Sequence, residues 1–167
     1  MKFIGLGANL NSPIYGSPKN TLEIALDKLK TINIDPIRIS PWYRSTAVPS
    51  SNQPDFVNAV AEVDSTLTPH ELIKSLLFVE SIFGRKRGLQ NEARIIDLDL
   101  LVYDSLIITG TIVDGVNAIV PHPRMNYRRF VLIPLRDLSP DWIDPKTGVG
   151  INYLISQLPK GQIVEAL

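Results

Sequence analysis

The 167-residue sequence contains no cysteine, which excludes disulfide bonds, thiolate nucleophiles and thiolate metal sites. It has 17 basic and 17 acidic side chains, so its formal net charge is zero and no general attraction to nucleic acid or to an anionic membrane is expected. It also lacks a long apolar run, because MKFIGLGANL at the N-terminus is too short for a signal peptide or a membrane span. We therefore expect a cytoplasmic protein in which any anion site is local.

Common nucleotide-binding and hydrolytic signatures are missing too. GLGANL, at residues 5–10, begins like a dinucleotide fingerprint, but Leu10 stands where the third glycine would be. No Walker A sequence occurs, and the two histidines, His70 and His122, accompany no evident Ser-His-Asp set. A nucleotide site in this chain must be built in another way.

The spacing of apolar residues predicts one α+β domain over residues 1–167. A composition of 44% hydrophobic residues is enough for a sizeable core. Ser17 before Pro18, and Thr68 three residues before Glu71, are typical helix starts. The order β-α-β-β-α-β predicts a ferredoxin-like core with helices packed on a mostly antiparallel sheet, followed by extra C-terminal strand and helix elements. We expect strands at residues 2–7, 34–45, 55–63 and 93–105, helices at 17–30 and 68–84, and a helical turn beginning near 128.

The stretch ARIIDLDLLVYDS, at residues 93–105, places two carboxylates on one face of an apolar strand. Asp97 and Asp99 lie about 7 Å apart along such a strand, where they repel each other. One interpretation is a solvated face whose acids pair with nearby arginines. The other is a site for Mg²⁺, which takes one or two carboxylates together with phosphates and water. Strand alternation places Leu101 and Tyr103 on the same face as the two acids. It places on the opposite, core face Ile96, Leu98, Leu100 and Val102.

Arginines flank this acidic strand in the sequence. Arg85, Arg87 and Arg94 precede the two acids and Arg128 follows them, and guanidinium groups suit bidentate contact with phosphate. An arginine-rich loop by itself is usually a solvated turn. Beside a metal-type acid pair in a neutral protein, it favours a polyphosphate site with metal on one side and arginines on the other. His122, between two prolines, is either a structural turn residue or a phosphate contact.

Phe56 and Asn58 fall on one face of the strand expected at residues 55–63. Taken alone, Phe56 is better interpreted as a core residue of a half-buried strand. Taken together, an aromatic ring and an amide on one face suit a planar nitrogen heterocycle, which can stack on the ring and hydrogen-bond to the amide.

These motifs, in this order, resemble the 6-hydroxymethyl-7,8-dihydropterin pyrophosphokinase family of folate biosynthesis. The resemblance implies transfer of the β,γ-pyrophosphoryl group of ATP to the hydroxymethyl oxygen of the pterin, giving the pterin diphosphate and AMP. ATP would be the co-substrate, two Mg²⁺ ions would be the cofactors, and the enzyme would be a monomer acting on small molecules, with no nucleic acid or membrane partner. The resemblance covers almost the whole chain and rests on GLGANL, YRSTAV, QPDFVNAV, ESIFGRKR, RIIDLDLL, VPHPRM and RRFVLIPL.

The resemblance also implies a role for each matched residue on the ATP side. Asp97 and Asp99 would be ligands of both metal ions, and with Arg85 and Arg94 they would form the catalytic set. The residues contacting ATP would be Glu80, Arg85, Arg87, Arg94, His122 and Arg128.

On the pterin side, the resemblance implies a flat pocket. Phe56 and Phe130 would sandwich the pterin ring, and Asn58 would hydrogen-bond to its edge. Backbone groups at Ser45 and Val48 would complete the pocket.

The segment before the acids departs from the family pattern. Related sequences often carry Arg-Trp-Gly-Pro-Arg there, whereas this chain has Gln-Asn-Glu-Ala-Arg at residues 90–94. The tryptophan that would fold over the pterin is therefore missing near Asn91. Ala8 also replaces the serine expected in the first motif.

Two other functions fit the same residues. One is a non-catalytic ferredoxin-like module that binds a small ligand, with the acids as surface charge. The other is a metal-dependent nucleotidyltransferase with an Asp-x-Asp pair, which would release pyrophosphate rather than AMP.

Overall fold

The computed structural model describes residues 1–85 and 92–167 of the chain. Arg87 and Asn91, both named above, lie outside the described residues. The elements, in chain order, are β1 (Lys2–Ala8), α1 (Pro18–Lys30), β2 (Asp35–Ile39), β3 (Tyr43–Ser45), β4 (Phe56–Asp64), α2 (Pro69–Ile82), β5 (Asp97–Tyr103), β6 (Ile108–Val113), β7 (Val116–Val120), the 3₁₀ turn η1 (Met125–Tyr127), α3 (Arg129–Leu138), α4 (Ile151–Ser156) and β8 (Val164–Ala166).

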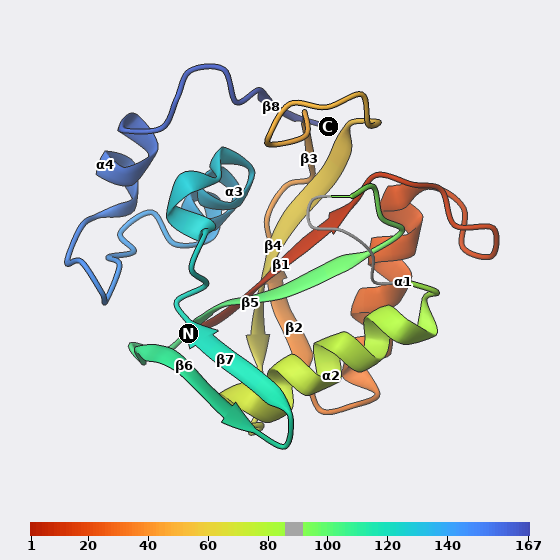
Figure 1. Cartoon of the computed structure of the whole chain (residues 1–167), viewed down its shortest axis with the longest axis horizontal. Helices are drawn as coiled ribbons and strands as arrows, with labels where there is room; N and C mark the ends of the chain where they lie inside the picture. The colour runs from red at the N-terminus through yellow and green to blue at the C-terminus, as the bar shows by residue number, and fades with distance from the viewer. Residues whose placement is uncertain (86–91) are drawn as a thin grey trace.

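Within the described ranges, six strands form the main sheet, in the order β5-β1-β4-β3-β8 with β2 also paired to β4. Every pairing in this sheet is antiparallel. Because β1 lies between β5 and β4, and β4 between β1 and the β2–β3 segment, the predicted ferredoxin-like α+β fold is confirmed. One hydrophobic cluster packs α1 and α2 against one face, and a second packs α3 and α4 against the other (Figure 1).

The first two helices begin where the sequence predicts. Ser17 accepts a hydrogen bond from the Asn20 amide and caps α1. Thr68 and Glu71 form a reciprocal capping box at the start of α2. The segment at 34–45, expected as one strand, is instead divided into β2 and β3 around Pro41, which has no N–H to donate to a sheet.

The antiparallel pairing of β5 with β1 contains a β-bulge. The register places Leu100 opposite Ile4 and Val102 opposite Phe3, so Leu101 is an extra residue without a partner on β1. An insertion of one residue exchanges the two faces of a strand, because side chains alternate with a period of two.

The bulge makes the predicted faces of β5 right at its start and wrong at its end. Asp97 and Asp99 face the α3 side of the sheet, and Leu98 packs under α1 and α2, as alternation predicts. Beyond the bulge the prediction is wrong: Val102 packs on the α3 side and Tyr103 packs against the cluster under α1 and α2.

The remaining elements lie after β5. β6 and β7 form a separate hairpin, whose turn has a positive φ at both Asp114 and Gly115. The Nε2 atom of His70, in α2, lies 2.9 Å from the Thr111 carbonyl oxygen of this hairpin. The expected C-terminal strand and helix elements are present as β8 and α4. None of the helices described combines the length and the apolar character needed to cross a bilayer.

Candidate active site

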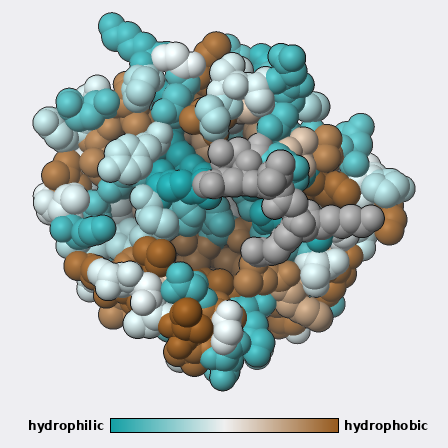
Figure 2. Space-filling view, viewed as in Figure 1, coloured by the Kyte–Doolittle hydropathy of each residue, from teal (hydrophilic) through white to brown (hydrophobic). Residues whose placement is uncertain are grey.

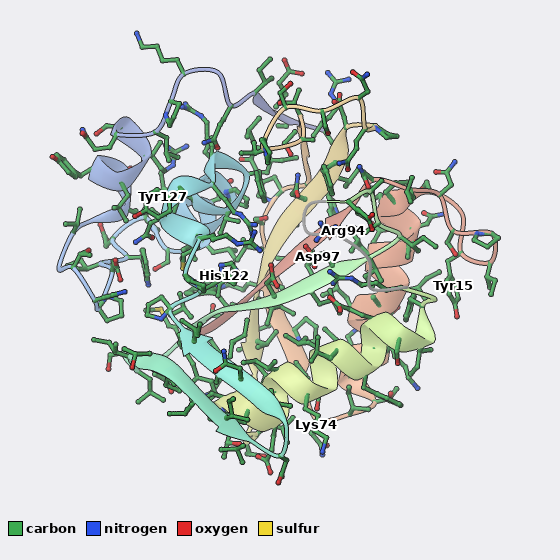
Figure 3. All side chains as sticks on the ribbon, viewed as in Figure 1. Tyr15, Lys74, Arg94, Asp97, His122 and Tyr127 are labelled. Carbon is green, nitrogen blue, oxygen red and sulfur yellow. The ribbon has the colours of Figure 1, made fainter. Side chains whose placement is uncertain are left out.

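A cavity of about 660 Å³, including its open mouth, lies on the sheet face next to the start of α3. Arg94, Asp97 and His122 surround the middle of the view in Figure 3, between the α1–α2 side and the α3 side. Figure 2, in the same view, shows hydrophilic residues gathered just off the centre of the molecule, on its α3 side. The described lining residues are Gly5, Leu6, Gly7, Thr46, Ala47, Val48, Phe56, Asn58, Ala59, Arg94, Asp97, Asp99, Leu101, Arg128, Phe130 and Val131.

The cavity brings the two halves of the predicted site together. Its lining joins the aromatic and amide residues expected to face a pterin with the acids and two of the arginines expected to face ATP. Four other predicted residues are not part of the lining, namely Ser45, Glu80, Arg85 and His122. Arg87 lies outside the described residues.

Two glycines of β1 form part of the cavity floor. Gly5 and Gly7 lie on the same strand face as Phe3, which is buried under α3. A Cβ atom on Gly7 would lie 3.3 Å from the Oδ1 atom of Asn58. The absence of side chains at these two positions of β1 therefore leaves room for a flat ligand in the cavity.

Two arginines hold the carboxylate of Asp97. Arg85 Nη1 donates to Oδ1 at 2.6 Å, and Arg94 Nη1 donates to Oδ2 at 2.8 Å. A guanidinium group carries five N–H donors in a planar fork, so it can bind Asp97 and an oxyanion at the same time. This pairing was one of the two interpretations of the acids, and it does not compete with phosphate binding.

Asp99 has weaker charge compensation than Asp97. His122 Nε2 and Arg128 Nη1 both lie 3.8 Å from Asp99 Oδ2. Burial, and then the negative charge of Asp97, raise the pKa of Asp99 to about 6. Burial, and then the charges of Arg128 and Arg124, lower the pKa of His122 to about 4, so His122 is neutral at pH 7 and does not neutralise Asp99.

Glu80, on α2, supports the acidic strand from behind. Its side chain is buried, and its Oε1 atom accepts hydrogen bonds from the Leu98 amide at 2.7 Å and from Arg85. Burial raises the pKa of Glu80 to about 7, although the charge of Arg85 acts in the opposite direction. Glu80 thus connects α2, Arg85 and β5, and the family resemblance implies that it also contacts ATP.

The apolar half of the cavity carries the predicted rings and amide. Phe56 and Phe130 both line it, and the guanidinium carbon of Arg128 lies 5.5 Å from the centre of the Phe130 ring. Asn58 Nδ2 donates to Ser45 Oγ at 2.7 Å, and both residues are buried. This hydrogen bond fixes the orientation of the Asn58 amide.

Sequence patterns did not single out Asn9, which joins the two loops beside the cavity. Its Nδ2 atom donates to Gln53 Oε1 at 3.2 Å and to the Pro54 carbonyl at 3.0 Å. Its Oδ1 atom accepts from the Arg94 amide at 2.7 Å. Asn9 is only 4% exposed, so a buried amide at the end of the GLGANL strand is the signal that marks it.

The donor set at the acids suits a hard divalent cation. Among the residues described, no three or more His, Asp or Glu side chains lie together as a ready metal cage. Asp97 and Asp99 nevertheless face one cavity from one strand, and the Arg128 guanidinium lies 3.8 Å from Asp99, beyond hydrogen-bond distance. Two carboxylates suit Mg²⁺, which completes its octahedral shell with substrate phosphates and water.

A family model described as 7,8-dihydro-6-hydroxymethylpterin-pyrophosphokinase (HPPK) matches residues 3–140. The chain belongs to this family. The matched range includes every described residue that lines the cavity. The family inferred from the sequence motifs is therefore confirmed.

Several curated relatives of this HPPK family member are named 2-amino-4-hydroxy-6-hydroxymethyldihydropteridine pyrophosphokinase. The protein from Synechocystis is 37% identical over 93% of this chain and 74% of its own length. The protein from Haemophilus influenzae is 31% identical over 98% of this chain and 96% of its own length.

A solved structure of Plasmodium falciparum HPPK-DHPS with pteroate has the same fold as this HPPK family member. The TM-score is 0.72 at 13% identity, over 93% of this chain. The match covers 44% of the Plasmodium chain, so this chain spans less than half of that protein. At this identity, the likeness supports the fold alone.

Proposed function

We propose that this HPPK family member transfers the β,γ-pyrophosphoryl group of ATP to the hydroxymethyl oxygen of 6-hydroxymethyl-7,8-dihydropterin in folate biosynthesis. The products are the pterin diphosphate and AMP. The observation that carries this proposal is one cavity in which an acid pair flanked by arginines adjoins a ring-and-amide pocket. A module that only binds a ligand has no need of two half-buried and mutually repelling acids on one strand face.

The pterin occupies the apolar half of the cavity in this proposal. Phe56 and Phe130 stack on the two faces of the ring, and Asn58 bonds to its polar edge. The hydrogen bond from Asn58 to Ser45 supports this assignment, because it presents the amide to a ligand in one orientation. Backbone near Val48, at the cavity wall, meets the pterin from the side.

The triphosphate of ATP occupies the polar half. Arg94 and Arg128 line it, and Arg85 reaches Asp97 from behind. His122 is neutral at pH 7, so it contributes a hydrogen bond to phosphate rather than a charge. Arg87 and Glu80 complete the ATP residues that the family resemblance implies.

Asp97 and Asp99 would hold the Mg²⁺ ions, two in number by the family resemblance. Bound there, magnesium would neutralise phosphate charge and lower the pKa of the pterin hydroxyl. The protein's own contribution is positional, since pyrophosphoryl transfer needs alignment and charge stabilisation more than covalent chemistry. Arg85 and Arg94 fix Asp97, while the sheet and the two rings direct the hydroxymethyl group toward the phosphates.

A nucleotide assay tests the proposal. The purified chain is incubated with ATP, Mg²⁺ and the hydroxymethyl pterin, and the nucleotides formed are separated. AMP that appears only with the pterin supports pyrophosphoryl transfer. ADP indicates an ordinary kinase, released pyrophosphate indicates a nucleotidyltransferase, and magnesium-dependent ATP binding without turnover indicates a binding module. Each of these three outcomes overturns the proposal.

We further propose that residues 1–167 act as a single domain and as a monomer in the cytoplasm. The two hydrophobic clusters share the same sheet, which supports a single folding unit. Sedimentation equilibrium at assay concentrations tests the monomer, and a dimer mass would contradict it.

A further inference from the structure

Gln162 binds the backbone on both sides of Arg128. Its Oε1 atom accepts a hydrogen bond from the Arg129 amide at 2.7 Å. Its Nε2 atom donates to the Tyr127 carbonyl at 2.9 Å. The two polar ends of one side chain thus engage the two peptide groups that flank a single arginine.

The position of these bonds gives them a function in the local fold. The amide of Arg129 opens α3, and the first amides of a helix have no partner within the helix. Arg128 itself has an extended backbone and no side-chain cap. Gln162 therefore supplies the missing partner and limits rotation of the chain at Arg128, which is where the 3₁₀ turn η1 meets α3.

Arg128 projects from this junction into the cavity. Its Nη1 atom lies 3.8 Å from Asp99 Oδ2, and its guanidinium group lies over the Phe130 ring. A change in the backbone angles at residue 128 would move this guanidinium group away from both partners. The orientation of a cavity cation thus depends on a residue more than thirty positions later in the chain.

The segment that carries Gln162 is itself anchored at both ends. Leu158, before it, packs into the cluster under α3 and α4. After it, β8 pairs with β3, and the Leu167 amide donates to the Trp42 carbonyl at 2.9 Å. Figure 1 shows this segment passing from α4 across to the β3 end of the sheet. Gln162 is therefore held in place by its flanks, independently of Arg128.

We propose that Gln162 is a positioning residue that orients Arg128 toward the phosphate half of the cavity. Gln162 acts through Arg128 and does not touch substrate. This inference rests on the proposed function, in which Arg128 contacts ATP. It assigns a role in the reaction to the C-terminal segment, beyond residues 3–140 that match the family model.

The central experiment is a double-mutant cycle between Gln162→Ala and Arg128→Ala. We expect Gln162→Ala to lower kcat/KM for ATP by about tenfold, which is below the roughly 100-fold loss that a 1 Å misplacement of a reacting group can cause. In the Arg128→Ala background, the same change should have no further effect, because residues that act as a unit are not additive. Full additivity of the two effects would overturn the proposal.

Gln157→Ala is the matched control. Gln157 has the same side chain, five residues earlier, and within the described part of the chain its side-chain amide donates only to Ser156 Oγ, at 3.2 Å. We expect this variant to retain wild-type kcat/KM and melting temperature. A loss equal to that of Gln162→Ala would mean that any change in the segment disturbs the site, and would refute a specific role for Gln162.

Gln162→Glu separates the two hydrogen bonds. A carboxylate still accepts from the Arg129 amide but cannot donate to the Tyr127 carbonyl, so kcat/KM should fall between the wild type and Gln162→Ala. Amide hydrogen exchange gives a readout that needs no turnover. Exchange of the Arg129 amide should quicken in Gln162→Ala without a change in melting temperature. Unchanged exchange would contradict the positioning role of Gln162.

Calorimetry of the binding of a non-hydrolysable ATP analogue with Mg²⁺ distinguishes the proposed pyrophosphoryl transfer from the proposed positioning role of Gln162. Pyrophosphoryl transfer is disproved if the wild-type protein binds the analogue but forms no AMP from ATP in the nucleotide assay. In that case a weaker affinity in Gln162→Ala, absent in the Arg128→Ala background, still supports the positioning role. Equal affinity of Gln162→Ala and wild type, with AMP formed equally well by both, rejects the positioning role alone.

Discussion

Asp97 and Asp99 share one strand face but not one environment. Asp97 accepts hydrogen bonds from two guanidinium groups, whereas Asp99 has its nearest described cationic nitrogen at 3.8 Å. We expect Asp99→Asn to lower kcat by about 1,000-fold, as removal of a central electrostatic group does elsewhere. The fold should persist, because the amide replaces a carboxylate that burial disfavours. Near-normal turnover at saturating Mg²⁺ would contradict the metal-binding role, and circular dichroism checks the fold.

Glu80 should give the folded protein a pH dependence that Glu80→Gln lacks. Its pKa is about 7 when folded, above the ordinary value near 4.5 expected when unfolded. A raised pKa in the folded state means that folding favours the protonated form, so stability from this group is present at low pH and lost as pH rises toward 7. The melting temperature of Glu80→Gln minus that of the wild type should therefore increase from pH 5 to pH 7.5. A constant difference would exclude this titration.

Phe56 permits a test of the pterin half alone. Stacking of one ring on another contributes about 1 kcal/mol beyond burial. Phe56→Leu keeps an apolar side chain of similar size and removes the ring, so the KM for the pterin should rise about fivefold. The KM for ATP should stay at the wild-type value. Equal changes in both constants would mean that Phe56 supports the whole cavity rather than the pterin.

At the scale of elements, Asn9, directly after β1, connects the loop after β3 with the segment that precedes β5. Asn9→Ala removes three hydrogen bonds of a buried amide, so we expect a loss of about 1 to 3 kcal/mol in unfolding free energy. Amide exchange should quicken in both flanking segments together. Faster exchange in one segment alone would show that Asn9 does not connect them. Urea unfolding measures the free energy, with Asn52→Ala in the exposed loop as control.

Local signals in the sequence were sufficient for some elements. The capping residues of α1 and α2, and the shared face of Phe56 and Asn58, follow from spacing within a few residues. The β6–β7 hairpin was not predicted although Asp114-Gly115 is a strong turn signal, because β6 is mostly exposed and has no buried face to give an alternating pattern.

Long-range features could not be predicted in this way. The bulge at Leu101 depends on how β1 pairs with β5, and alternation within β5 alone gives no sign of it. The bonds of Asn9 and Gln162 join residues far apart in the chain, and a polar side chain in the sequence does not reveal its distant partner. The roles of the site residues also stay predictions. Sequence spacing indicates which side chains share a face, but it does not show what they bind.

At the scale of the whole molecule, each face of the sheet has its own hydrophobic cluster, and the described cavity lies on the α3 side of the sheet. Leu29, in α1, and Leu132, in α3, are both fully buried, so replacement of either by alanine should cost about 2 to 5 kcal/mol. Of these two helices, α3 carries described cavity residues, Phe130 and Val131, and α1 carries none. At assay temperatures well below the melting temperature, Leu132→Ala should therefore lower kcat/KM, whereas Leu29→Ala should leave it unchanged. Equal activity in the two variants would contradict this division.

The bulge in β5 separates two requirements that one strand must meet. Without an extra residue, the alternation that turns the acids toward the cavity would also determine the packing of everything after them. Since Leu101 resets the alternation, the half of β5 that leads into the hairpin can change its packing without turning Asp97 and Asp99 away from the cavity. One strand can therefore present two acids to the cavity at its start and pack Tyr103 under α1 and α2 at its end.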